Sequence, residues 1–361
     1  MKKGFLAGLA IAMVVLTMFA SCSKKAAGTG ITTRILTDAT GIDDKSFNAS
    51  AWRGIERFYD NTSLRNKSYS YVTAQSQDQY IPNLNNAADE DISLIIASGF
   101  TWSDSIKTVA SQHPNQKFML IDAAGVNLPN VVETLFAEEM GSYLVGVIAA
   151  EQAKAEGIEN PGFGFVGGVP GATITKFEMG YVQGVRSVFP NARIVDYYAN
   201  NWGAPEMAKA QAKNWFDSGI YCIFSAAGST GNGVIAQAKE ERAKGKKVWA
   251  IGVDSDQFED GLYNSTDSAV LTSMLKKVEN ATFQILTELK DGKFISGIRV
   301  FDLSIDAVGY SDRNVKMAKT AKDAAEKAKK NILSGKVVVE KTFAGAKAKG
   351  LVPASLHAVD D

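Results

Sequence analysis

The feature that most constrains this chain is a regular alternation of short apolar runs with segments of helical periodicity. The first run, 33–37, is followed by a segment at 44–59 whose apolar side chains recur at a spacing near 3.6. The alternation continues to about residue 155 and restarts at residue 162. Repeated strand–helix units build parallel sheets that helices cover on both faces. The sequence therefore predicts an α/β protein with two doubly wound parallel-sheet lobes.

The expected elements fall into two series. Strands are expected at 33–37, 69–73, 93–97, 117–121, 131–135, 162–166, 193–197, 222–226, 247–253 and 268–272. Helices are expected at 44–59, 82–90, 103–112, 138–156, 173–188, 205–217, 233–244, 275–289 and 312–334.

These series divide the chain into two lobes and a short tail. Lobe 1 is assigned residues 31–155, with 274–292 returning to it. Lobe 2 is assigned residues 156–273 with 293–345, and a C-terminal tail covers 346–361.

The N-terminus has the pattern of an export signal. Two lysines precede an uncharged apolar stretch at 4–20, and small residues then lead to Cys22. This order resembles a bacterial lipobox, so we expect residues 1–21 to be a lipoprotein signal peptide and Cys22 to carry the lipid. Residues 22–30 would form a polar tether. The alternative is a plain signal peptide with an incidental cysteine. The first interpretation predicts an exported protein anchored to the cell membrane by lipid.

Composition excludes several classes of function. Lys and Arg total 39, as do Asp and Glu, and a balanced charge argues against nucleic acid as a partner. Two His and two Cys leave little material for a His-built metal site, a His-dependent triad or a disulfide framework. The glycines of Gly162-x-Gly164-x-x-Gly167 lie inside an expected strand, where a dinucleotide loop does not occur. We therefore expect no cofactor, no metal and no enzyme.

Acidic residues and a glycine loop follow several of the expected strands. Asp38, Asp122 and Asp254 each come directly after a strand, and Gly228 opens a glycine-rich loop between a strand and a helix. Open α/β sheets bind ligands at the carboxyl ends of their strands. A carboxylate there can accept hydrogen bonds from two hydroxyl groups, which suits a vicinal diol such as ribose. The alternatives are solvated turn acids and an ordinary tight turn.

Two aromatic residues stand near strand ends in different lobes. Phe47 lies at the start of the first helix, and Trp202 follows a strand of the second series. Either residue alone is most simply a core side chain. If they face each other across the lobes, they would sandwich a planar ring.

Several of these segments resemble the basic membrane protein family, the PnrA-like purine-nucleoside-binding lipoproteins. The resemblance includes Asp43-Asp-Lys-Ser-Phe-Asn48 and spans about residues 31–310. It rests on the segments 37–52, 96–100, 118–122, 228–234, 251–256 and 271–276. It implies a type I periplasmic-binding-protein fold, with two lobes joined by a hinge, and a role in nucleoside transport.

The resemblance also implies roles at the base end of a ligand. Asp38 matches the family residue that holds the purine. Phe47 matches the aromatic residue that stacks on it, with Asn48 beside it. Trp202 takes the place of the second stacking residue, where the family commonly has Phe.

At the sugar end, Gly228, Asp254 and Lys276 match the residues that hold the ribose. Lys276 would pair with Asp254 and orient it, and Asp122 would be a further contact in the cleft.

The sequence thus predicts a monomeric, lipid-anchored solute-binding protein. It would capture purine nucleosides in an interlobe cleft and deliver them to an ABC-type permease. The alternative is a surface lipoprotein on the same fold that acts as an adhesin or a ligand-sensing receptor.

Overall fold

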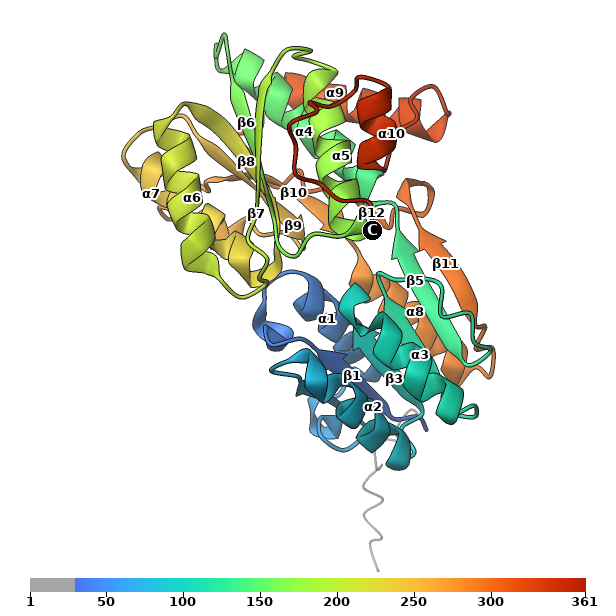
Figure 1. The fold of residues 1–361 in the computed structure, drawn as a ribbon. Coiled ribbons are helices and arrows are strands. Elements are labelled where there is room, and N and C mark those ends of the chain that lie inside the picture. The colour runs from blue at the N-terminus through green and yellow to red at the C-terminus, as the bar shows by residue number, and fades with distance from the viewer. Residues whose placement is uncertain (1–29) are drawn as a thin grey trace, which may run out of the picture.

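A computed structural model describes residues 30–361 and shows two α/β lobes, each built on a six-stranded sheet (Figure 1). The predicted signal peptide and Cys22 lie outside these residues. The strand order is β11-β5-β4-β3-β1-β2 in lobe 1 and β12-β10-β9-β8-β6-β7 in lobe 2. All pairs are parallel except β10 with β12. The prediction of two doubly wound lobes is confirmed.

The strands of lobe 1 are β1 (Thr33–Thr37), β2 (Tyr69–Thr73), β3 (Leu94–Ser98), β4 (Phe118–Ile121), β5 (Val131–Phe136) and β11 (Gly297–Phe301). Its helices are α1 (Phe47–Tyr59), α2 (Tyr80–Asp89), α3 (Ser103–Gln112) and α8 (Val278–Lys290). The strands of lobe 2 are β6 (Gly162–Gly167), β7 (Arg193–Tyr198), β8 (Ile220–Ala226), β9 (Trp249–Asp254), β10 (Val270–Lys276) and β12 (Val308–Tyr310). Its helices are α4 (Glu138–Ala155), α5 (Ala172–Arg186), α6 (Pro205–Asp217), α7 (Asn232–Ala243), α9 (Lys319–Leu333) and α10 (Phe343–Ala348).

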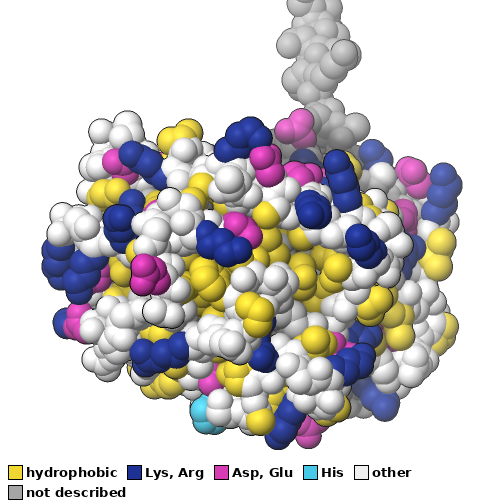
Figure 2. Space-filling model, turned by 90° about the horizontal axis from the view of Figure 1, so that it is seen from above, with side chains coloured by type: hydrophobic (Ala, Val, Ile, Leu, Met, Phe, Trp, Pro, Cys, Tyr) yellow, Lys and Arg dark blue, Asp and Glu magenta, His cyan; other side chains and the backbone are white. Residues whose placement is uncertain are grey.

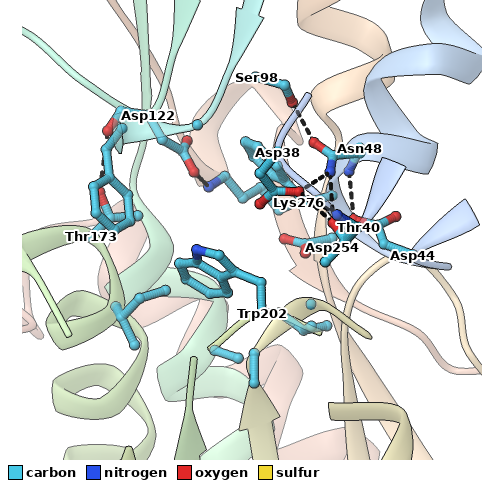
Figure 3. Close-up of a pocket in the computed structure, with 18 of the residues that line it drawn as sticks. Asp38, Thr40, Asp44, Asn48, Ser98, Asp122, Thr173, Trp202, Asp254 and Lys276 are labelled. Carbon is cyan, nitrogen blue, oxygen red and sulfur yellow. Dashed lines mark hydrogen bonds and ion pairs between the residues drawn. The ribbon is translucent and has the colours of Figure 1, made fainter. Parts of the chain in front are cut away.

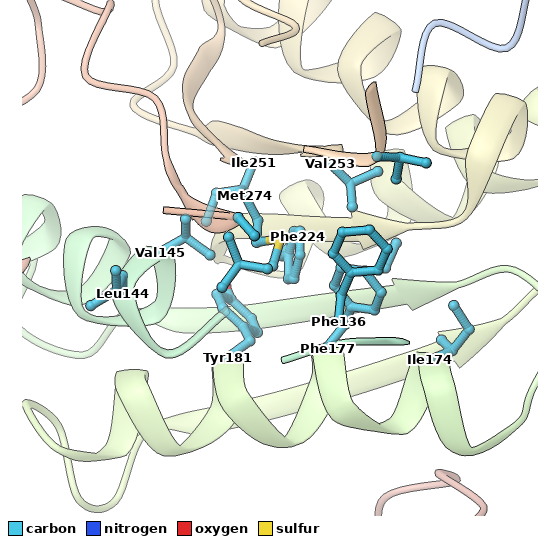
Figure 4. Close-up of a cluster of buried hydrophobic side chains, with 14 of the residues drawn as sticks. Phe136, Leu144, Val145, Ile174, Phe177, Tyr181, Phe224, Ile251, Val253 and Met274 are labelled. Atoms are coloured by element: carbon cyan, nitrogen blue, oxygen red, sulfur yellow. The ribbon is translucent and has the colours of Figure 1, made fainter. Parts of the chain in front are cut away.

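Each sheet is covered on both faces because nearly all of its central strand residues are apolar and buried. In lobe 1, α2 and α3 pack on one face and α1 and α8 on the other. In lobe 2, α6 and α7 cover one face, and α4 and α5 cover the other. The core under α4 and α5 includes Phe177, Phe224 and Met274 (Figure 4).

Glycine residues let α4 and α5 approach closely. A Cβ atom on Gly180 would lie 2.3 Å from the carbonyl oxygen of Glu139, and one on Gly146 would lie 2.3 Å from that of Tyr181. Both distances are far below van der Waals contact, so only glycine permits this helix pair.

The chain crosses between the lobes three times: after β5, after β10 and after β11. The predicted division differs from this at two places. The sequence predicts α4 within lobe 1, but the helix packs on α5 and β10 of lobe 2. Nearly all sides of α4 are buried, so the periodicity of its apolar residues does not indicate which lobe it contacts. The sequence places β11 in lobe 2, but the strand pairs with β5 in lobe 1.

Other differences concern the C-terminal third. The expected strand at 268–272 runs to Lys276, and the expected helix at 312–334 begins only at Lys319. The tail at 346–361 is packed onto lobe 2, with Val352, Leu356 and Ala358 buried. The carbonyl oxygen of Val359 accepts a hydrogen bond from the Thr175 hydroxyl group.

Charges of both signs are interspersed on the face seen in Figure 2, where no large patch of one sign is visible. Within residues 30–361, every helix is too short or too polar to cross a membrane.

Candidate functional site

A cavity lies between the two lobes and is lined by residues of both (Figure 3). Residues that end or follow β1, β3 and β4, together with the start of α1, line it from lobe 1. Residues that end or follow β7, β8, β9 and β10, together with the start of α5, line it from lobe 2. The structure brings all the predicted site residues together here: Asp38, Phe47, Asn48, Asp122, Trp202, Gly228, Asp254 and Lys276. Parallel strands end on the same edge of a sheet, which is why residues so far apart in sequence converge.

A hydrogen-bonded row fixes the polar side chains of one end. The Ser98 hydroxyl group donates to Oδ1 of Asn48 at 2.7 Å, so the Asn48 amide nitrogen must face Asp38. That nitrogen donates to Oδ1 of Asp38 at 3.2 Å. Thr40 donates to the same oxygen from its backbone nitrogen at 3.0 Å and from its hydroxyl group at 2.5 Å. These bonds occupy Oδ1 of Asp38 and leave Oδ2 for a ligand.

Asp44 fixes the start of α1, which carries Phe47 and Asn48. Its buried carboxylate accepts hydrogen bonds from the backbone nitrogens of Ser46, Asn48 and Ala49 at 2.8–3.0 Å. These are donors that a helix start leaves without intrahelical partners. Burial nevertheless raises the pKa of Asp44 above its ordinary value.

At the other end of the cavity, Lys276 is held by two carboxylates. Its Nζ atom lies 2.5 Å from Oδ2 of Asp122 and 2.9 Å from Oε1 of Glu138. The expected pairing of Lys276 with Asp254 is therefore wrong. The Asp254 carboxylate forms no ion pair within residues 30–361, because Lys276 at the end of β10 extends toward the crossing after β5.

Asp122 and Asp254 both have carboxyl oxygens that accept no hydrogen bond. Oδ1 of Asp122 is buried without a partner in the described part of the chain. The side chain of Asp254, a residue that is 8% exposed, forms no hydrogen bond to any described residue. Burial raises the pKa of Asp122 to about 6, although Lys276 lowers it. Burial likewise raises the pKa of Asp254 to about 8, with Lys276 again opposing the effect. Because both residues line the cavity, these oxygens are placed to accept hydrogen bonds from a bound molecule.

Asp122 and Asp254 occupy equivalent places in the two lobes. One follows β4 and the other ends β9, and each of these strands is third in its sheet order. Both residues have left-handed backbone angles, with φ values of 69° and 63°. Non-glycine residues in this region are uncommon and cluster at functional sites.

Four aromatic side chains line the cavity: Phe47 and Phe100 from lobe 1, and Phe177 and Trp202 from lobe 2. Phe100 and Trp202 meet edge to face across the lobes, with ring centroids 6.1 Å apart. The Lys276 ammonium lies 5.0 Å from the centre of the Phe47 ring and 5.4 Å from that of Phe177. Figure 3 shows the Trp202 indole projecting into the space below Lys276 and Asp122.

Glycines and one threonine set the position of Trp202. A Cβ atom on Gly168 would lie 2.1 Å from the indole, and one on Gly228 would lie 3.7 Å from it. The Thr230 backbone nitrogen donates to the Trp202 carbonyl oxygen at 2.8 Å. The glycine loop therefore supports Trp202 in addition to lining the cavity.

Polar contacts join the lobes around the cavity. Lys45 pairs with Asp260 at 2.6 Å, and the Ser255 hydroxyl group donates to the Ser46 carbonyl oxygen at 3.2 Å. The Thr173 hydroxyl group donates to the Asp122 carbonyl oxygen at 3.2 Å. The lobes are thus in contact on both sides of the site.

Sequence reasoning missed several residues here. Ser98 ends β3 and Phe100 follows it. Both residues could therefore have been predicted from the general placement of ligands at the carboxyl ends of parallel strands. Phe177 and Glu138 carry no such signal, because they lie within or at the start of long helices. Among residues 30–361, no group of three or more His, Cys, Asp or Glu side chains is arranged to hold a metal ion.

Known proteins are similar to this chain over most of its length. A family model described as ABC transporter substrate-binding protein PnrA-like matches residues 31–342. The CD4+ T-cell-stimulating antigen of Listeria innocua is 37% identical over 317 residues, which cover 85% of this chain and 87% of the relative. The ABC transporter nucleoside-binding protein BmpA of Lactococcus lactis is 34% identical over 355 residues, covering 94% and 99%.

Solved structures share the fold. A solute-binding protein of an ABC transporter system from Aeropyrum pernix superposes with a TM-score of 0.76 at 26% identity, covering 89% of this chain and 97% of that one. A second transporter solute-binding protein, from Conexibacter woesei, superposes with a TM-score of 0.63 at 17% identity, covering 86% and 99%. The predicted type I periplasmic-binding-protein fold is confirmed.

Proposed function

The chain belongs to the family of PnrA-like ABC transporter substrate-binding proteins, and from this premise we propose that it captures purine nucleosides between its lobes and delivers them to an ABC-type permease. It is a substrate-binding protein and not an enzyme. We further propose that it is exported and anchored to the cell membrane through a lipid on Cys22.

The observation that carries the proposal is the division of one cavity into two chemically different ends. One end offers aromatic faces together with the Asp38–Asn48 row. The other offers Asp122, Asp254 and Lys276. A purine nucleoside has the same division, a planar base with polar edges joined to a sugar with vicinal hydroxyl groups.

The base fits the first end for physical reasons. Phe47 and Trp202 would contact its faces, since ring stacking is favourable with offset or edge geometries. Oδ2 of Asp38 would accept a hydrogen bond from a base N–H group, and the amide of Asn48 is oriented by Ser98. Phe47 comes from lobe 1 and Trp202 from lobe 2, so both rings would contact one ligand only when the lobes are closed.

The sugar fits the second end because its hydroxyl groups are donors. They would donate to Oδ1 of Asp122, which is buried without a partner among the described residues, and to the Asp254 carboxyl group, while Lys276 donates to a sugar oxygen. The nucleoside-binding relative from Lactococcus lactis supports this choice of ligand class.

Calorimetric titration of the soluble form, from residue 23 onward, tests the proposal. Adenosine, guanosine and inosine should bind at least tenfold more tightly than adenine, because charge-assisted hydrogen bonds contribute about 1.5–3 kcal/mol each. Asp254→Ala should remove most of that preference. Equal affinities of the wild-type protein for adenine and adenosine would contradict the assignment of the sugar end.

Delivery to a permease needs a separate measurement. Cells that lack the protein should lose uptake of labelled adenosine at low concentration and recover it when the gene is restored. Binding without any effect on uptake would favour a receptor on the same fold.

A further inference from the structure

An ion-pair network joins Lys276 to Glu138, a residue behind the cavity that is not among the proposed ligand contacts. Glu138 begins α4 directly after the first crossing between the lobes, and it does not line the cavity. Its Oε1 atom lies 2.9 Å from Nζ of Lys276, and its Oε2 atom lies 3.1 Å from Nζ of Lys176 on α5. The side chains of Glu138 and Lys276 are each 1% exposed.

The two carboxylates that hold Lys276 come from different lobes. Asp122 follows β4 in the sheet of lobe 1. Glu138 and Lys276 belong to α4 and β10, which pack together in lobe 2. Hinge closure in two-lobed proteins moves the lobes as rigid bodies. Opening the cleft would therefore take Asp122 away from Lys276 and leave Glu138 beside it.

We propose that Glu138 is a positioning residue for nucleoside binding, holding the Lys276 ammonium in place while the lobes are apart. Closure then brings Asp122 and the ribose to a cation whose position is already fixed. This inference rests on the proposed function, since it assumes that Lys276 contacts the ligand.

The surroundings of Lys276 explain why it needs a permanent counter-ion. The rings of Phe47, Phe136 and Phe177 lie 4.9–5.4 Å from its ammonium group. These rings attract a cation but do not replace the hydrogen bonds of a carboxylate. Phe47 belongs to lobe 1 and would move away with Asp122, so the open cleft leaves Lys276 with fewer favourable contacts.

Electrostatics are consistent with this role. Burial lowers the pKa of Lys276, but Asp122 and Glu138 outweigh burial and hold that pKa above its ordinary value. Burial raises the pKa of Glu138, but Lys276 and Lys176 outweigh it and hold that pKa below its ordinary value. Glu138 is thus a charged partner for both lysines.

The test compares adenosine with adenine on Glu138→Gln, which removes the charge with little change in shape. The affinity for adenosine should fall about 10- to 100-fold, because one charge-assisted bond to the ligand is lost or misdirected. Adenine lacks the sugar oxygen to which Lys276 is proposed to donate, so its affinity should change less than about threefold. The selectivity for the nucleoside is a readout that a purely structural role would not change.

A double-mutant cycle shows whether Glu138 acts through Lys276. In a Lys276→Met background, Glu138→Gln should change adenosine affinity less than about twofold. Glu178→Gln is the control for replacing a buried carboxyl group of lobe 2, since the partner of Glu178 is Tyr198 and not Lys276. It should alter thermal stability and leave the selectivity unchanged.

The inference would be overturned if folded Glu138→Gln bound adenosine as tightly as the wild type. It would also be overturned if Glu138→Gln weakened adenosine binding equally in the wild-type protein and in Lys276→Met. If Glu138→Gln does not fold, Glu138→Asp gives the same comparison, because it keeps the charge but draws it back by one methylene. Its selectivity should lie between those of the wild type and Lys276→Met, and full wild-type selectivity would again overturn the inference. A wild-type protein that binds no nucleoside would instead overturn the proposed function.

Discussion

The Asp254 carboxyl group is subject to two opposing effects, burial and the nearby Lys276 ammonium. Burial raises its pKa to about 8, Lys276 lowers it, and the negative charges of Asp122, Asp44 and Glu138 raise it further. A pKa near 8 favours the protonated form of Asp254 at pH 7 in the free protein. Hydroxyl groups that donate to the ionised form would lower this pKa in the complex.

Proton release on binding follows from that shift. Because the complex then holds fewer protons than the free protein, nucleoside affinity should rise with pH up to about 8 and level off above it. Calorimetry at pH 7 in two buffers of different ionisation enthalpy should detect the released proton. Asp254→Asn should abolish the release, and a wild-type protein that exchanges no proton would contradict the prediction.

The two predicted stacking residues give a second test. Phe47→Ala should weaken purine nucleosides by roughly 2–4 kcal/mol, a factor on the order of 30 to 1000, because stacking and apolar burial are both lost. Any weak binding of free ribose should change little, since the sugar is placed away from the ring faces. Titration calorimetry of the variant with adenosine and ribose measures both values.

Trp202→Phe separates stacking from packing within lobe 2. It should keep most of the nucleoside affinity and remove part of the ligand-induced fluorescence change. If Trp202 only packs against Gly168 and Gly228, the variant would instead lose thermal stability and keep the fluorescence change intact.

At the scale of the elements, helices position the site by close packing. Helix α4 carries Glu138 at its start and lies against α5, which carries Lys176 and Phe177. Their separation depends on glycine, because the backbone of one helix occupies the space that a methyl group on the other would need.

Gly180→Ala should therefore destabilise the protein by about 1–3 kcal/mol, since its Cβ atom would meet the Glu139 backbone at 2.3 Å. Urea unfolding measures this change. Gly309→Ala is the control, because a Cβ atom there meets no atom within 4 Å, and its effect should stay within about 0.5 kcal/mol. Equal stability of the two variants would contradict the packing argument.

At the scale of the whole molecule, three crossings join two separately packed lobes, and the cavity lies where they meet. The contacts across the cleft include the ion pair of Lys45 with Asp260 at the surface, the buried pair of Lys276 with Asp122 and the edge-to-face contact of Phe100 with Trp202. A surface ion pair such as Lys45 with Asp260 contributes about 0–1 kcal/mol, so it does little to hold the lobes closed.

Membrane attachment concerns the segment before the described residues. The wild-type chain should partition into the detergent phase, because two or more acyl chains on Cys22 would give stable anchoring. Cys22→Ala should leave the protein in the aqueous phase after phase separation. A Cys22→Ala variant that still partitions fully with detergent would contradict the lipoprotein interpretation.

The sequence by itself determined the order and type of nearly all elements, because buried parallel strands and amphipathic helices leave distinct periodicities. It also placed Asp38, Asp122, Gly228 and Asp254 on one edge of their sheets, since each follows a strand. That rule depends only on local order along the chain.

Only the tertiary structure decided which carboxylates pair with Lys276. It also decided to which lobe α4 and β11, the elements next to the crossings, belong. Lys276 pairs with Asp122 and Glu138 and not with Asp254, because three crossings bring the ends of β4, β10 and the start of α4 together. Helix α4 and strand β11 are assigned to their lobes by contacts with residues distant in sequence. Periodicity describes which face of an element is apolar but does not identify its neighbour, and that is the physical reason the sequence could not supply these answers.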